Sequence, residues 1–152
     1  MPTYTVSYSS RVNAPAAVAY DIIADYRDGH PHILPPKYFR NLQVQSGGRG
    51  AGTRITFDMG ALGYWRSVAA EIGEPEPGRL LEETIPAERV QTSFLVEAVG
   101  ENACDVTIST TMPQRAGIAG SIERLTTSAF MRRVYREELS MLDRVARSRA
   151  TR

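Results

Sequence analysis

The chain has 152 residues, of which 42% are hydrophobic, so it can build one domain with a real core but is too short for two domains of ordinary size. Its 18 basic and 17 acidic residues leave a formal net charge of +1, so the charge balance gives no sign of nucleic acid as a partner. The single cysteine, Cys104, excludes an intramolecular disulfide and a cysteine-based metal cluster.

The N-terminal part of the chain predicts one strand followed by two short helical segments. Residues 3–12 alternate between apolar and polar side chains, which is typical of a strand with one buried face. Pro15 then suits the first turn of a short helix over residues 16–26. Residues 30–39 contain three prolines and therefore predict a loop or a single helical turn.

Between residues 40 and 108 the apolar residues recur with a period of two. This pattern predicts six strands that are linked by hairpins. Glycines mark the first turns of this region, and a proline-rich turn follows the third strand. The expected strands cover residues 40–46, 53–59, 64–72, 80–85, 90–98 and 106–108.

Residues 115–147 predict the only long helix of the chain, with basic residues toward its C-terminal end. Its apolar residues form two stripes that face different directions, and the polar residues between them favour a kink or short break at 126–129. The front segment would then cap a cavity while the rear segment packs on the sheet. A straight helix buried broadly on both faces is the alternative. The front stripe consists of Ile118, Ile122, Leu125 and Ala129.

Three segments of the sequence carry a resemblance to a known family, namely VNAPAAVAYDIIADY, AAEIGEPEPGRLL and MPQRAGIAGSIERL. They resemble the START-related superfamily with the helix-grip fold, also called SRPBCC, which includes polyketide cyclases, pollen-allergen-like proteins and lipid-transfer domains. The resemblance covers nearly the whole chain and is strongest to the polyketide cyclase/dehydrase and coenzyme Q-binding branch. It implies a single α+β domain over residues 1–152, with a curved antiparallel sheet of about seven strands wrapped around a long C-terminal helix and two short helices after the first strand. It also implies a deep apolar cavity, but it transfers no particular reaction.

Arg66 is the most informative polar residue of the predicted sheet. Strict alternation over residues 64–72 places its side chain on the inner face, where an unpaired charge is costly. One interpretation is an ion pair with Glu83 or Glu82 on the next strand, or a position from which the side chain reaches water. The other is an anchor for a ligand carboxylate or phenolate. Glu82 and Glu83 are adjacent and therefore point to opposite faces.

Two histidines, His30 and His32, lie in the proline-rich loop after the first helix. A metal site would need a third ligand, and none is close in the sequence, so we expect no metal. One histidine at the mouth of the cavity, represented by His32, could act as a general acid or base, and an exposed loop histidine is the simpler interpretation.

Large apolar residues on the inner faces of the predicted elements are the remaining candidates for ligand contacts. In an ordinary small domain they would simply form the core, whereas a sheet curved around a helix leaves room for a pocket lined by aromatic residues. Trp65 falls on the outer face and ranks below its neighbours. The candidates are Tyr38, Phe57, Met59, Tyr64, Phe94, Met112 and Ile122.

Three functional hypotheses follow from these observations. The first is the binding of a small hydrophobic ligand, such as a lipid, an isoprenoid or quinone, or a polyketide-like molecule, whose polar head would be oriented by Arg66, Glu83 or a histidine. The second is a polyketide cyclase/dehydrase-type enzyme that uses the same cavity, although the predicted inner face shows no dense cluster of titratable residues. The third is a protein-interaction module. We expect no cofactor, no nucleic-acid partner, no integral membrane segment and a cytoplasmic location.

Overall fold

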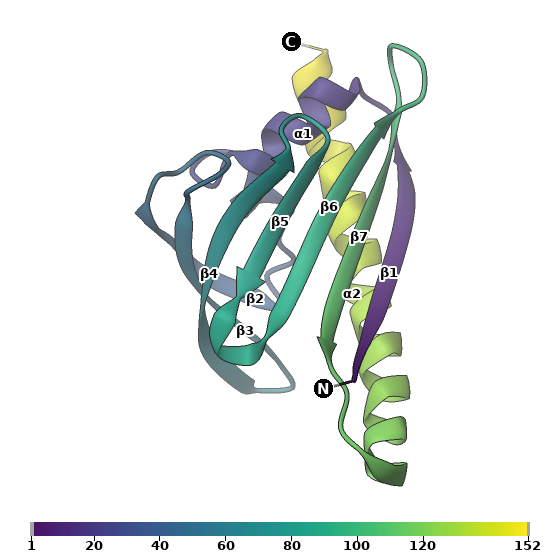
Figure 1. The fold of residues 1–152 in the computed structure, drawn as a ribbon. Helices are drawn as coiled ribbons and strands as arrows, with labels where there is room; N and C mark the ends of the chain where they lie inside the picture. Colours follow the sequence, from purple (N-terminus) through teal and green to yellow (C-terminus); the bar gives the residue numbers. More distant parts are fainter. Residues whose placement is uncertain (1, 152) are drawn as a thin grey trace.

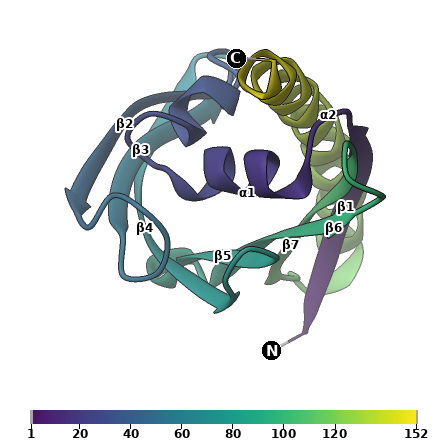
Figure 2. The same ribbon diagram turned by 90° about the horizontal axis from the view of Figure 1, so that it is seen from above.

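Seven strands form one antiparallel sheet in the computed structural model, which describes residues 2–151. The sheet curves around a long C-terminal helix, α2 (Gly117–Ala150), as Figures 1 and 2 show. The predicted α+β helix-grip fold is therefore confirmed. The order of the strands across the sheet is β1-β7-β6-β5-β4-β3-β2. The strands are β1 (Thr3–Val12), β2 (Phe39–Ser46), β3 (Arg54–Ala61), β4 (Tyr64–Glu76), β5 (Leu80–Ile85), β6 (Val90–Ala98) and β7 (Cys104–Pro113).

The first and the last strands of the sequence lie side by side, and their outer faces are joined by polar side chains. Val6 and Val12 of β1 point inward and are fully buried, as the alternation predicts. On the outer face, hydroxyl groups pair across the two strands at 2.7–2.9 Å, and an ion pair closes the series. These pairs are Thr5 with Thr111, Ser7 with Ser109, Ser9 with Thr107 and Arg11 with Asp105.

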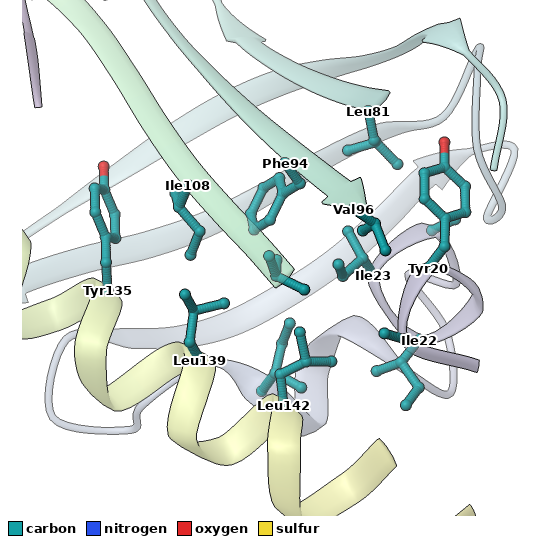
Figure 3. Packing of buried hydrophobic residues seen from close by; sticks show 14 of the residues in the cluster. Tyr20, Ile22, Ile23, Leu81, Phe94, Val96, Ile108, Tyr135, Leu139 and Leu142 are labelled. Atoms are coloured by element: carbon teal, nitrogen blue, oxygen red, sulfur yellow. The ribbon is translucent and has the colours of Figure 1, made fainter. Parts of the chain in front are cut away.

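The rear half of α2 packs on the concave face of the sheet. Figure 3 shows Tyr135, Leu139 and Leu142 pointing from the helix toward Ile108 and Phe94 of the sheet, and all five side chains are buried. Burial of apolar surface of this kind is the main favourable contribution to folding. The second predicted stripe of the helix therefore forms part of the core.

The front half of α2 differs from the prediction. The helix is continuous over its 34 residues, so the short break expected at 126–129 is wrong. The Thr126 hydroxyl does donate back to the carbonyl groups of Ile122 and Glu123, but the helix continues past it. Ile118, Ile122 and Leu125 are 82%, 57% and 72% exposed, because this part of α2 extends beyond the end of the sheet (Figure 1). This apolar stripe does not line the cavity, although Glu123 and Thr127 of the same part of the helix do.

Two short helical elements follow β1 and cover one end of the curved sheet (Figure 2). They are α1 (Ala16–Ala24) and the single-turn helix η1 (His30–Ile33); a second single turn, η2 (Pro86–Glu88), links β5 to β6.

Backbone hydrogen bonds fix the segment between α1 and η1. The Tyr26 amide donates to the Gly48 carbonyl at 2.8 Å, and the His30 amide donates to the Asp25 carbonyl at 2.7 Å. Gly29 is required between them, because a Cβ atom there would lie 2.4 Å from the Ile22 carbonyl oxygen. The side chains of Tyr26 and His30 are thereby held over the interior.

Candidate functional site

A cavity of about 610 Å³ lies between the concave face of the sheet and α2. One end is covered by α1 and η1, where His30 is only 2% exposed. The other end opens beside the β3–β4 hairpin, where Tyr64 is 85% exposed. Most of the predicted ligand contacts line this cavity. They are Tyr38, Phe57, Met59, Tyr64, Arg66, Glu83, Phe94 and Met112.

Three polar side chains meet at the covered end of the cavity. The Tyr26 hydroxyl donates a 2.6 Å hydrogen bond to Oε1 of Glu83, and Nε2 of His30 lies 3.3 Å from the same oxygen. The imidazole of His30 stacks on the ring of Tyr26 with 4.4 Å between the ring centroids. Tyr26 comes from the segment after α1, His30 from η1 and Glu83 from β5, so the fold brings them together from distant positions.

The hydrogen bonds of His30 determine where a proton must lie. Nδ1 is 2.8 Å from the Ile23 carbonyl, which can only accept, so Nδ1 carries a hydrogen. Nε2 then faces a carboxyl oxygen of Glu83 at 3.3 Å. His30 and Glu83 therefore form an imidazole–carboxyl contact at the wall of the cavity, and both are groups that can take up or give up a proton.

A second carboxyl group, that of Glu138, enters the cavity from α2. Its side chain is 3% exposed. Burial, followed by the charge of Glu83, raises the pKa of the Glu138 carboxyl well above its ordinary value. Ionisation of this carboxyl group is therefore more costly here than in water.

Hydroxyl groups form a chain along the neighbouring wall. The hydroxyl groups of Tyr135 and Thr110 are hydrogen-bonded, and the Thr110 hydroxyl also lies 2.8 Å from that of Thr92. Burial raises the pKa of the Tyr135 phenol, so this group stays protonated at neutral pH. All three residues line the cavity and add hydrogen-bonding capacity to an otherwise apolar wall.

Arg66 lies at the mouth of the cavity and not beside Glu83 or Glu82. Its guanidinium donates two hydrogen bonds to the carboxylate of Glu88 in η2, at 2.9 and 3.1 Å. The expected ion pair thus exists with a different partner. The side chain has the inner orientation that alternation predicts, but β4 reaches the rim at this point, so the side chain is 58% exposed.

Two predicted contacts do not line the cavity. His32 is exposed on the outer side of η1, and His30, two residues earlier, occupies the interior instead. Ile122 points into solvent from the part of α2 that extends beyond the sheet. Trp65 lies on the outer face as expected, where the Arg40 guanidinium stacks on its ring at 3.8 Å.

The expectation that the inner face has no dense cluster of titratable groups is wrong. Tyr26, His30, Glu83, Tyr135 and Glu138 converge at the covered end of the cavity or on its wall. A signal for Glu138 was present in the sequence, because this charged residue lies at helical spacing within the rear apolar stripe of α2. Tyr26 carried no comparable signal, because an aromatic residue at the end of a short amphipathic helix is explained equally well as part of the core.

The described residues contain no group of three or more His, Cys, Asp or Glu side chains arranged to hold a metal ion. Within the same part of the chain, no helix is long and apolar enough to cross a membrane. The polar side chains that line the cavity carry carboxyl, imidazole, guanidinium, phenol and hydroxyl groups.

Comparison with protein-family models defines the class of this protein. The model described as polyketide cyclase/dehydrase and lipid transport matches residues 3–147, so the chain belongs to that family. No match is found among curated proteins.

Solved structures share the fold over nearly the whole chain. The solution structure of KanY protein is 24% identical with a TM-score of 0.82, and the match covers 97% of this chain and 99% of that one. The Zhui aromatase/cyclase from Streptomyces sp. R1128 is 16% identical with a TM-score of 0.78, covering 97% and 96%. Norcoclaurine synthase from Thalictrum flavum, solved with dopamine and hydroxybenzaldehyde, is 15% identical with a TM-score of 0.70, covering 95% and 86%.

Proposed function

We propose that this protein binds a small hydrophobic molecule in the central cavity, with the polar head of that molecule at the covered end. The observation that carries the proposal is the cavity of about 610 Å³, which falls in the range of roughly 300–1,000 Å³ usual for small-molecule sites. The apolar walls would supply affinity through buried area.

Two features of the cavity support this orientation. The aromatic and aliphatic side chains lie along the walls and at the mouth, represented by Tyr38, Phe57 and Met59. The buried polar groups lie at the end covered by α1 and η1. A ligand with an apolar body and a small polar head matches this distribution. The membership of the chain in a family that includes lipid transport agrees with it.

The test is a titration with N-phenyl-1-naphthylamine, a neutral hydrophobic dye whose fluorescence rises in apolar surroundings. We expect a saturable increase with one dye per chain. Thr127→Trp should weaken binding at least about tenfold, because Thr127 lines the cavity and a larger side chain would occupy part of it.

Ser128→Trp is the matched control. It places the same side chain one position later on α2, at a half-buried residue that does not line the cavity, and should bind the dye as the wild type does. Loss of binding in both variants, or in neither, would contradict the proposal, as would the absence of saturable binding to the wild-type protein.

The second candidate is a proton-transfer enzyme of the cyclase or dehydrase type. The contact between His30 and Glu83 favours it, because a buried imidazole–carboxyl pair can take a proton from one atom of a bound substrate and return it to another. The cavity would hold the reacting chain in a folded shape.

A linear poly-β-ketone thioester is a suitable probe for this candidate, with formation of an aromatic product followed by absorbance. Glu83→Gln should remove turnover while the dye still binds. Glu82→Gln should leave turnover unchanged, because Glu82 points to the outer face and bonds to Gln91. Equal turnover by wild type and Glu83→Gln would exclude the role of this pair, and no turnover by the wild type would leave ligand binding as the function.

A further inference from the structure

The charges that line the cavity are unbalanced. Four glutamates line it against one arginine and one histidine. Three of these glutamates have a basic partner. Glu88 pairs with Arg66, Glu83 with His30, and Glu123 with Arg115 of the segment before α2. Glu138 is the remaining glutamate.

Glu138 has no hydrogen-bond partner among the described residues. The side chain of Glu138 is 3% exposed. Among residues 2–151, every side-chain nitrogen or oxygen that is fully shielded from solvent has a hydrogen-bond partner. The carboxyl oxygens of Glu138 must therefore reach the open space of the cavity. A buried polar group without a protein partner is costly unless something else supplies a hydrogen bond.

The groups around this carboxyl decide which ligand heads fit. Glu83 lies on the sheet side and acts electrostatically on Glu138, and Tyr135 lies one turn earlier on α2. His30, which also lines the cavity, is already in contact with Glu83 and with the Ile23 carbonyl. A carboxylate or phosphate head would thus meet two carboxyl groups and no free cation, whereas a hydroxyl or an ammonium group could donate to Glu138.

We propose that the ligand of this cavity carries a hydrogen-bond-donating head without negative charge, a hydroxyl or an amine, which binds to Glu138, and that free carboxylates are excluded. This inference rests on the proposed function. It narrows the class of ligand to hydrophobic alcohols, phenols and amines. It also assigns Glu138 a binding role that neither the family description nor the apolar character of the walls implies.

Three compounds with the same apolar body test the inference, namely 2-(2-naphthyl)ethanol, 2-(2-naphthyl)ethylamine and 2-naphthylacetic acid. Each is titrated calorimetrically at neutral pH, and each is also used to displace N-phenyl-1-naphthylamine. We expect the acid to bind at least about tenfold more weakly than the better of the other two, which is the usual size of one unfavourable charged contact. The ranking of the alcohol and the amine shows which kind of donor the site prefers.

Glu138→Leu should reduce the difference between the acid and the better donor to less than about threefold, because leucine offers no oxygen to accept a hydrogen bond from a hydroxyl or an amine. Glu137→Leu is the matched control and should keep the full difference, since Glu137 is the adjacent residue but pairs with Lys37 outside the cavity. Equal binding of the three compounds to the wild type overturns the inference, and so does a difference that Glu138→Leu leaves unchanged. The wild-type ranking stands as a test even if the variant does not fold.

The two proposals fail in different ways. If neither the dye nor any naphthyl compound binds, the proposed function is wrong. If the dye binds and the three naphthyl compounds bind with equal affinity to one another, the cavity binds hydrophobic molecules but Glu138 does not select among their polar heads.

Discussion

The fold buries the carboxyl group of Glu138, and none of the described residues forms a hydrogen bond with it. Most buried polar groups in folded proteins are hydrogen-bonded, and a site that breaks this rule often serves function. Here the neighbouring Glu83 already accepts from Tyr26 and contacts His30, so it cannot compensate for the burial of Glu138. The cost of burying Glu138 should be visible in the stability of the empty protein.

Stability should depend on pH through Glu138. Its pKa in the folded protein lies well above the ordinary value of 4.5, so the folded state keeps a proton that the unfolded chain releases. The free energy of unfolding contributed by this group is therefore highest below about pH 4.5 and is lost as the pH rises toward the folded-state pKa, by up to about 1.4 kcal/mol per pH unit.

Urea unfolding of the wild type and Glu138→Gln between about pH 5 and pH 8 measures this effect. The difference in the free energy of unfolding, variant minus wild type, should increase with pH, because the amide does not titrate. Glu137→Gln should show a difference that does not change with pH in this way. A constant difference for Glu138→Gln would mean that Glu138 titrates alike in the folded and unfolded states.

The residues of the site were only partly predictable. Alternation along β5 placed Glu82 and Glu83 on opposite faces, because a strand has a strict period of two. Alternation did not show that the Tyr26 hydroxyl would bond to Glu83, because that hydrogen bond depends on how α1 and η1 pack against the end of the sheet. The choice between His30 and His32 depends on the rotation of a single turn, which no periodic pattern determines.

At the scale of elements, α2 consists of two parts with different surroundings. Its rear half contributes Leu139 and Leu142 to the core, while Ile118 and Leu125 in its front half remain exposed. The sequence shows two stripes of similar apolar character, and periodicity indicates only that each could be buried. Whether a stripe is covered depends on how far the strands opposite it extend. The N-terminal end of α2 extends beyond the edge of the sheet (Figure 1).

Substitutions on the two halves of α2 should have very different effects. Ile118→Gln and Leu125→Gln should each change the free energy of unfolding by less than about 0.5 kcal/mol, because both side chains are already in water. Leu139→Ala should cost about 2–5 kcal/mol, because it removes buried methyl groups and leaves a cavity.

Urea unfolding monitored by circular dichroism gives these values. A loss of more than about 1 kcal/mol from either glutamine variant would show that the front stripe is covered in solution, by this chain or by another copy of it. Repeating the measurement at two protein concentrations separates these explanations, since only association depends on concentration.

At the scale of the whole molecule, Cys104 reports on global unfolding. It opens β7, pairs with Val12 of β1, and is fully buried. Burial raises the pKa of its thiol from 9.0 to about 11. Since the thiolate is the reactive form, the folded protein holds about a hundredfold less of it at pH 8 than the unfolded chain does.

Alkylation by iodoacetamide at pH 8 should therefore be at least about a hundredfold slower in buffer than in denaturing urea. Between these limits the rate should follow the unfolded fraction measured by circular dichroism, because the two strands around Cys104 must separate before the reagent can reach it. Comparable rates in buffer and in urea would show that this edge of the sheet opens independently of the rest. The protein has no other cysteine, so the labelled site is unambiguous.

The fold as a whole followed from the sequence more completely than the site did. Each strand has one buried face, so the alternation of apolar and polar residues indicates which face meets the interior. Turns rich in glycine or proline separate the strands. The clearest difference among the strands is β7, which extends over Cys104–Pro113 where only residues 106–108 were expected. Its run of serine and threonine after Ile108 carries little apolar contrast, although Thr110 is buried.

The pairing of β1 with β7 has a consequence for how the chain reaches this fold. The strand made first on the ribosome has no neighbour in the sheet except the strand made last, and α2 is made later still. The segments from β2 to β6 can form hairpins as they emerge, but β1 must wait with its edge unpaired. Contacts between such distant segments slow folding, and exposed strand edges invite association with other chains. Assembly is therefore expected to finish in a late step, when β7 and α2 pack against β1.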